Sequence, residues 1–286
     1  MTSTGGPRVV AIGGGHGLAM SLRAIEAYAG HLTAVVATGD DGGSSGRLRA
    51  DLDMPAPGDL RRCLSALAAD ETVAHGFEHR FSAGPLEGHA VGNLVLAGLV
   101  DAGHDLGSAA DVVSGWLGID PNRVRILPAT DVAVDLVADT DRGTVRGQVQ
   151  IEESTGVRSV GFDPPAPPVP DEVLAAIGRA DQIVLGPGSF FTSVMGVAAV
   201  PDIAKAIDAA DAVVTLVANL DADPGVLVDR LRAHGIDPDV VVVQTGMSCA
   251  APAGVQIVEA DIVRPHGLAH DPALLSTVLA TPFSTS

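Results

Sequence analysis

An apolar strand pattern leads directly into a polar, glycine-rich loop in the segment Leu32-Thr33-Ala34-Val35-Val36-Ala37-Thr38-Gly39-Asp40-Asp41-Gly42-Gly43-Ser44-Ser45-Gly46-Arg47. The first six residues are apolar or β-branched, as in a strand that is buried on both faces of a parallel sheet. The next ten include two carboxylates, two serines, an arginine and four glycines, which an ordinary core does not require. Because open α/β sheets bind ligands at the carboxyl ends of their strands, this segment predicts a parallel sheet and places its site.

A second strand and glycine turn lie upstream of this segment. Arg8–Ile12 is predicted to be a buried strand, followed by Gly13-Gly14-Gly15-His16-Gly17 and an amphipathic helix from Leu18 to about Tyr28. This order lets backbone N–H groups and the helix dipole hold a phosphate, although a tight turn alone would also use glycine. The turn is not a dinucleotide fingerprint, because Leu18 stands where the third glycine is needed, and no Gly-Lys-Ser/Thr follows to make a P-loop.

Composition and charge restrict the class of protein. The chain has 286 residues, 47% of them apolar but only 3% aromatic, so we expect a single domain over residues 1–286 with a core of Val, Leu, Ile and Ala. A net charge of −18 disfavours nucleic acids and anionic membranes as partners. No apolar run approaches the roughly 20 residues of a membrane span, and Met1–Gly6 lacks the pattern of a secretory signal, so a cytoplasmic location is expected. Cys63 and Cys249 are far apart and are expected to be buried thiols.

The pattern along the chain indicates a doubly wound α/β fold with an insertion. Strand-like and helical segments alternate from Val9 to about Ala102 and again after Asp171, which predicts a parallel sheet with right-handed crossovers. Between them, an antiparallel insertion is expected at about 130–165, with a stiff polyproline connector over 164–170. Its predicted strands are Val132–Val137, Thr144–Ile151 and Val157–Gly161. The later parallel strands are predicted at Gln182–Leu185, Ala212–Ala218 and Asp239–Val243, with helices at Asp171–Arg179, Pro224–Ala233 and Asp271–Ala280.

The first polar loop and the residues after it carry charge. Asp40 and Asp41 are candidates to ligate Mg²⁺ or to accept sugar hydroxyls, and an N-capping role is the alternative. Asp59 is predicted to cap a helix over Leu60–Ala69. The four arginines in this region are either an anion site or a solvated face paired with Asp51 and Asp53; they are Arg47, Arg49, Arg61 and Arg62.

Two later loops carry weaker signals. His89 and Asn93 are four residues apart in a predicted helix that begins near Gly88, so they are expected on one face, where they would read a hydroxyl or phosphate. A purely structural histidine is the alternative. The run Gly186-Pro187-Gly188-Ser189 repeats the strand, glycine turn and helix order, so Ser189, Thr192 and Ser193 are either phosphate donors or simple caps.

Taken together, the loops resemble a known family. The motifs are Gly-Gly-Gly-His-Gly-Leu (13–18), Asp-Asp-Gly-Gly-Ser-Ser-Gly-Arg-Leu-Arg (40–49), Pro-Gly-Asp-Leu-Arg (57–61), Gly-His-x-x-Gly-Asn-Leu (88–94) and Gly-Pro-Gly-Ser-Phe-Phe-Thr-Ser (186–193). They resemble the YvcK family of gluconeogenesis factors, which is related to CofD, the 2-phospho-L-lactate transferase of cofactor F420 synthesis. The resemblance runs from Val9 to about Pro282. It implies a Rossmann-like fold and a cytoplasmic protein that binds UDP-sugars such as UDP-N-acetylglucosamine and couples carbon metabolism to cell-wall precursor supply and cell shape.

The resemblance also implies a set of binding residues. By motif they are Gly14, Gly15, Gly17, Asp40, Asp41, Ser44, Ser45, Arg47, Asp59, Arg61, His89, Asn93, Gly188, Ser189 and Asn219. His16 joins them, although the family more often has Thr there, and its ring adds a titratable donor. Arg62 stands where the family usually has Asn, and the family's loop after Asn219 is replaced by 221–226.

Three functions follow as hypotheses. The first is a regulatory protein that binds a nucleotide sugar, with no cofactor assigned to it. The second is a CofD-type phosphoryl or nucleotidyl transferase that uses Mg²⁺ at Asp40 and Asp41. The third, a nicotinamide-dependent oxidoreductase, rests on fold analogy alone and is disfavoured by the missing third glycine. The protein partners considered are a cell-wall precursor enzyme and a second copy of the chain.

Overall fold

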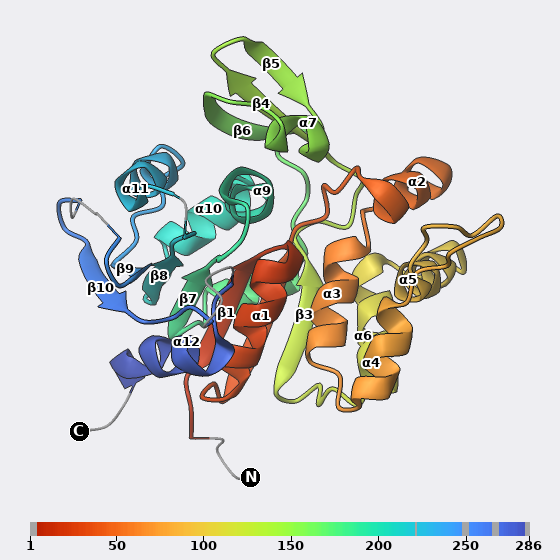
Figure 1. Cartoon of the computed structure of the whole chain (residues 1–286), viewed down its shortest axis with the longest axis horizontal. Helices are drawn as coiled ribbons and strands as arrows, with labels where there is room; N and C mark the ends of the chain where they lie inside the picture. The colour runs from red at the N-terminus through yellow and green to blue at the C-terminus, as the bar shows by residue number, and fades with distance from the viewer. Residues whose placement is uncertain (1–4, 221, 248–251, 265–268, 284–286) are drawn as a thin grey trace.

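A seven-stranded parallel sheet forms the centre of the molecule in the computed structural model, which describes residues 5–220, 222–247, 252–264 and 269–283 (Figure 1). Its strands are β1 (Arg8–Gly13), β2 (His31–Val36), β3 (Val124–Pro128), β7 (Gln182–Leu185), β8 (Val213–Val217), β9 (Val240–Gln244) and β10 (Gln256–Ala260). Their order is β10-β9-β8-β7-β1-β2-β3 and every neighbouring pair is parallel. The predicted α/β fold class is therefore confirmed.

Helices cover both faces of this sheet. On one face they are α1 (Gly15–Glu26), α3 (Gly58–Ala66), α4 (Glu71–Glu78), α5 (Val91–Asp101), α6 (Leu106–Trp116) and α12 (Pro272–Leu279), and on the other α8 (Asp171–Ile177), α9 (Met195–Ala198), α10 (Pro201–Asp208) and α11 (Pro224–Arg232). Alternate residues of one strand face opposite layers: Val9 and Ala11 pack with the α1 layer, and Val10 and Ile12 with the α9 layer. Both cores are built of Val, Ile, Leu and Ala, as the composition predicts.

The antiparallel insertion is present at the predicted place. Its sheet has the order β5-β4-β6, formed by β4 (Asp135–Thr140), β5 (Gly143–Arg146) and β6 (Val157–Asp163). It stands beyond the carboxyl ends of the large sheet, close to α2 (Gly43–Leu52) (Figure 1). The strand predicted over Thr144–Ile151 is wrong in its second half, because Gly147 takes a φ of 94° and the chain then forms α7 (Gln148–Glu152).

Other boundaries differ in smaller ways. The connector over 164–170 is not one continuous polyproline helix, because Ala166 has a φ of 53°. Cys63 is buried as predicted, whereas Cys249 and Asp221 lie outside the described residues. Among the described helices none is long and apolar enough to span a membrane alone; Phe190–Ala198 and Pro201–Asp208 pass that test only as a pair bent by 76°.

Candidate functional site

The two glycine-rich loops meet where β1 and β2 end. Gly13 pairs with Val36 in the parallel register, and Ala37 N–H donates to the Gly13 carbonyl at 2.8 Å. α1 then begins at Gly15, so Gly15, His16 and Gly17 form its first turn rather than a loop before it. The helix therefore starts three residues earlier than the amphipathic pattern predicts, and its N–H groups open at the carboxyl edge of the sheet.

Close approach explains two of these glycines. A Cβ at Gly14 would overlap the Asp59 carboxylate, and one at Gly17 would lie 2.6 Å from the Pro187 carbonyl carbon and 2.8 Å from Gly188 Cα. The first loop is thus packed directly against α3 on one side and against the loop after β7 on the other. The glycines are required by the protein's own packing, which is a reason for them besides ligand binding.

Asp59 is the most buried carboxylate of the site. It is 4% exposed, forms an ion pair with Arg62 and accepts a hydrogen bond from the Gly15 backbone. Burial raises the pKa of the Asp59 carboxyl, which Arg62 opposes and the nearby Asp40 reinforces. The prediction that Asp59 caps a helix is wrong: α3 begins at Gly58 after the N-cap residue Pro57, so Asp59 lies inside the first turn and its side chain turns to α1.

Asp40 and Asp41 point in different directions. Asp40 Oδ1 accepts the Gly42 N–H at 2.9 Å, and its other oxygen lies close to Gly58 at the start of α3. Asp41 Oδ1 accepts the Val149 N–H at 3.1 Å, which ties the loop to the first turn of α7 in the insertion. Asp40 is therefore the partner of Asp59 at the sheet edge, and Asp41 is directed towards the insertion.

Ser44, His89 and Asn93 form a buried hydrogen-bonded group. Ser44 Oγ lies 3.0 Å from His89 Nδ1 and accepts a hydrogen bond from Asn93 Nδ2 at 3.0 Å. Burial, followed by Arg47, lowers the pKa of His89, which favours the neutral ring. His89 and Asn93 do meet, but not on one helical face as predicted, because α5 begins at Val91 and His89 precedes it.

The arginine cluster separates into different contacts. Arg61 is 1% exposed and pairs with Glu78, while Arg62 pairs with Asp59 and Arg49 with Asp135. Arg47 Nη2 donates to the Glu87 carbonyl at 2.7 Å. In the described residues the ion pairs of Arg49, Arg61 and Arg62 thus go to Asp135, Glu78 and Asp59 and not to Asp51 and Asp53.

The loop after β7 is held by Asn219 at the end of β8. Gly188 N–H donates to Asn219 Oδ1 at 3.1 Å, and Asn219 Nδ2 donates to the Gly188 carbonyl at 2.6 Å. Thr192 Oγ1 lies 2.7 Å from Ser189 Oγ and 2.7 Å from Glu152 Oε1 of α7. Asn219 and Ser189 therefore help to fix this loop, Asn219 directly and Ser189 through Thr192, and the loop in turn contacts α1 at Gly17.

Most predicted residues thus form one connected region. Around the starts of α1 and α3 lie Gly14, Gly15, Gly17, Asp40, Ser45, Asp59 and Gly188. Beside the start of α2 lie Ser44, His89, Asn93 and Arg47. Two further residues face the insertion, Asp41 and Ser189. Sequence reasoning missed Glu78 and Glu152, which pair with Arg61 and Thr192. No sequence motif marks either glutamate.

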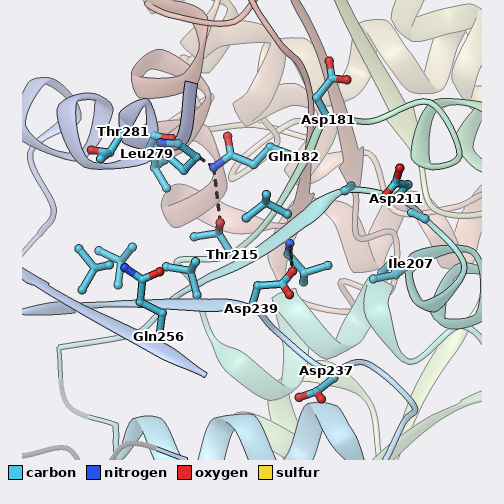
Figure 2. A pocket seen from close by; sticks show the side chains of 18 of the residues that line it. Asp181, Gln182, Ile207, Asp211, Thr215, Asp237, Asp239, Gln256, Leu279 and Thr281 are labelled. Atoms are coloured by element: carbon cyan, nitrogen blue, oxygen red, sulfur yellow. Dashed lines mark hydrogen bonds between the residues drawn. The ribbon is translucent and has the colours of Figure 1, made fainter. Parts of the chain in front are cut away.

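A cavity of about 520 Å³ opens beside this region, between α1, α3 and α4. A larger one of about 760 Å³ lies at the opposite edge, at the amino ends of β7, β8, β9 and β10, where carboxylates such as Asp181 and Asp239 lie among the polar side chains of Gln182 and Thr215 and apolar strand residues (Figure 2). None of the predicted site residues lines that larger cavity. We place the candidate site at the carboxyl edge, because the polar loops meet there.

The fold and its loops define a Rossmann-like α/β protein whose glycine turns gather at the carboxyl edge of the sheet. A family model described as "2-phospho-L-lactate transferase CofD" matches residues 9–246. The chain therefore belongs to the CofD family, as the motifs predict.

Relatives support this assignment. A protein of Deinococcus radiodurans is 43% identical over 229 residues, covering 78% of this chain and 48% of its own length, and one of Aquifex aeolicus is 39% identical over 259 residues, covering 84% and 78%. Both carry the name "Putative gluconeogenesis factor". The chain thus spans about half the length of the first relative. A crystal structure of a UPF0052 family member from Bacillus halodurans superposes with a TM-score of 0.89 at 30% identity, covering 96% of this chain and 98% of that one.

Proposed function

We propose that the carboxyl edge of the sheet binds the diphosphate of a nucleotide sugar of the UDP-N-acetylglucosamine type. The observation that carries this proposal is that three helices begin there with glycine, and the N-cap residue of none of them supplies a side-chain cap: α1 at Gly15, α2 at Gly43 and α3 at Gly58. Asp59 already accepts the Gly15 N–H, so an anion would bind to the other first-turn N–H groups. The first N–H groups of a helix have no partner within the helix, and together with the helix dipole they favour an anion.

The side chains around these helix starts suit the rest of such a ligand. Arg62 supplies positive charge beside the first turns of α1 and α3, and Ser45 lies against Gly58. Asp40 offers a carboxylate oxygen to sugar hydroxyls. Each charge-assisted hydrogen bond contributes roughly 1.5–3 kcal/mol, so the loss of two would abolish useful binding.

In this proposal the protein is a cytoplasmic regulator that links carbon metabolism to cell-wall precursor synthesis and cell shape. The names of its relatives support the metabolic part, and the motif resemblance supports the rest. A cell-wall precursor enzyme is the protein partner that this role would require.

Calorimetric titration with UDP-N-acetylglucosamine tests the proposal. Wild type should bind, and Ser45→Ala should weaken binding about fivefold, the equivalent of one hydrogen bond of about 1 kcal/mol. Ser276→Ala, on the distant helix α12, is the matched control and should bind as wild type does. Absence of both heat and a thermal shift in wild type would refute the proposal.

A CofD-type transferase is the second candidate, and one observation favours it. Asp40 and Asp59 place two carboxylates beside the same helix starts, and Arg62 pairs with Asp59 only, so a further cation would offset the repulsion between Asp40 and a diphosphate. Mg²⁺ is commonly held by one or two carboxylates together with substrate phosphates, so this pair fits the ion better than Asp40 with Asp41. In the described residues no cluster of three or more His, Cys, Asp or Glu forms a metal site independent of a ligand.

The two candidates differ in their response to Asp40→Asn. If Mg²⁺ bridges Asp40 and the diphosphate, EDTA and Asp40→Asn each remove the Mg²⁺-dependent part of binding, together with any transfer from a nucleotide diphosphate donor to an acceptor. If binding needs no metal, EDTA has no effect, and Asp40→Asn leaves pyrophosphate binding equal or tighter because one negative charge is gone. Asp101→Asn, on the outer end of α5, controls for net charge.

A further inference from the structure

The cavity between α1, α3 and α4 is a groove that begins at the candidate site and leads away from it. The three helices lie side by side on one face of the sheet (Figure 1). α1 and α3 both start at the carboxyl edge and run away from it, whereas Glu78 at the end of α4 returns to pair with Arg61 in the first turns of α3. The groove therefore has one end at the helix starts and the other end near the middle of the molecule.

The two ends of the groove are polar, and its middle is mainly apolar. His16, Arg62 and Glu78 line the end at the candidate site. Ala19, Met20 and Ala74 line the middle, together with one polar ring, that of His75. Ser65, Arg23 and Glu71 line the far end, where Arg23 Nε donates to the Ala66 carbonyl at 2.9 Å.

Several buried polar atoms along this groove have no hydrogen-bond partner within the described parts of the chain. They are Ser65 Oγ at the far end and Arg62 Nε and Glu78 Oε1 at the near end. Ser65 is only 7% exposed, so its hydroxyl is desolvated without compensation. Leaving such a group unpaired costs roughly 1–3 kcal/mol, which a ligand with complementary polar edges would recover.

We propose that this groove holds the nucleoside of the bound nucleotide, with the phosphates at the helix starts, the ribose beside Glu78 and the edge of the base at Ser65. This inference rests on the proposed function. The order of the lining matches the order of groups in a nucleotide: an anion at His16 and Arg62, then hydroxyls at a carboxylate, then a flat apolar ring against Ala19, Met20 and Ala74.

Dimensions support a nucleoside. The step from His16 to Arg23 covers roughly 10 Å of helix axis at about 1.5 Å per residue, which is about the extent of a nucleoside. The volume of about 520 Å³ lies within the range of roughly 300–1,000 Å³ that is usual for small-molecule sites. A hexose fits the middle less well than a base does, because His75 is the one polar lining residue there and several hydroxyls would need partners, whereas a base needs partners only at its edge.

Three ligands distinguish the parts of the site. Pyrophosphate, UDP and UDP-N-acetylglucosamine are titrated by calorimetry into wild type, Ala74→Trp and Val73→Trp. Ala74 lines the groove, whereas Val73 is the preceding residue of the same helix and is 48% exposed, so its variant controls for the added indole. Ser65→Ala is the second variant, because it removes one hydroxyl without filling the groove.

We expect Ala74→Trp to weaken UDP and the UDP-sugar by about tenfold or more while pyrophosphate changes less than about twofold. Ser65→Ala should weaken UDP about fivefold and leave pyrophosphate unchanged. Val73→Trp should bind all three as wild type does. The proposal is overturned if Ala74→Trp leaves UDP unaffected, if it weakens pyrophosphate equally, or if only the UDP-sugar is weakened, since the groove would then hold the sugar. Failure of wild type to bind any of the three refutes the proposed function instead, and the inference with it.

Discussion

Replacing Gly17 by alanine tests whether the first glycine loop is held in place by the loop after β7. The new Cβ would overlap the Pro187 carbonyl oxygen and lie 2.6 Å from its carbon, whereas ordinary Cβ contacts begin at 3.4 Å. The two loops must therefore separate by at least about 0.8 Å, the difference of those two distances. Both are backbone segments, and no flexible side chain can move aside. Overpacking of this kind costs about 1–3 kcal/mol, and it outweighs the gain of about 0.5–1 kcal/mol that alanine brings to a helix.

Gly98→Ala is the matched control, because Gly98 also lies in a helix, α5, and a Cβ added there would meet no atom of the described residues outside its own helix within 4 Å. Urea unfolding of the two variants should therefore change in opposite directions: the midpoint falls for Gly17→Ala and rises slightly for Gly98→Ala, with the m-value unchanged in both. Pyrophosphate binding should weaken in Gly17→Ala alone. Equal stability of the two variants would show that the contact between these loops does not constrain the site.

Three other substitutions follow from the same contacts. Asp59→Asn should raise the free energy of unfolding at pH 7–8, because burial raises the pKa of Asp59 in the folded state and ionisation of its carboxyl costs stability as the pH rises. The difference in free energy between variant and wild type should vanish below about pH 4, where the carboxyl is protonated in both the folded and the unfolded state. Urea titrations across pH that show no such convergence would contradict this expectation. Glu78→Ala leaves the buried guanidinium of Arg61 without its counter-ion and should lower the free energy of unfolding, measured by heat or urea, by about 1–3 kcal/mol. The control Glu153→Ala, at an exposed residue, should lower it by less than about 0.5 kcal/mol. Similar losses in both variants would show that the Arg61–Glu78 ion pair does not stabilise the fold. Asn219→Ala removes both hydrogen bonds to the Gly188 peptide and should lower stability by about 1–3 kcal/mol while weakening pyrophosphate binding, whereas Asn122→Ala, in an exposed turn, should do neither.

The sequence predicts the elements of this fold well because its strands are continuous apolar runs. Apart from the polar end residues Arg8, His31 and Gln244 and the β-branched Thr33, the strands Arg8–Gly13, His31–Val36 and Val240–Gln244 are such runs, and buried parallel strands need no alternation to be recognised. The insertion is also recognisable from its Val- and Thr-rich segments and its glycine turns. The strand predicted over Thr144–Ile151 fails at Gly147, because the helix that follows is stabilised by Asp41, 108 residues away.

The same limit applies to the site. The sequence indicates which loops gather at the sheet edge, since that follows from strand order. It does not indicate which side chains pair, because those partners are distant: Arg49 with Asp135 and Ser44 with His89. Asp59 shows the effect on a single residue. Its position beside a proline and a glycine is typical of an N-cap, but the approach of α1 draws its carboxylate to the Gly15 backbone instead.

The glycine starts of α1, α2 and α3, whose N-cap residues supply no side-chain cap, affect how much of this protein exists at a given time. An anion seated on them binds the native chain and not the unfolded one, so it adds RT ln(1 + [L]/Kd) to the stability, roughly 2.7 kcal/mol at a hundredfold excess over Kd. Cellular proteases act on the unfolded fraction, and that fraction shrinks about a hundredfold under these conditions. The supply of ligand would then set the lifetime of the molecule as well as its occupancy, and measurements in phosphate buffer would report a more durable protein than measurements without it.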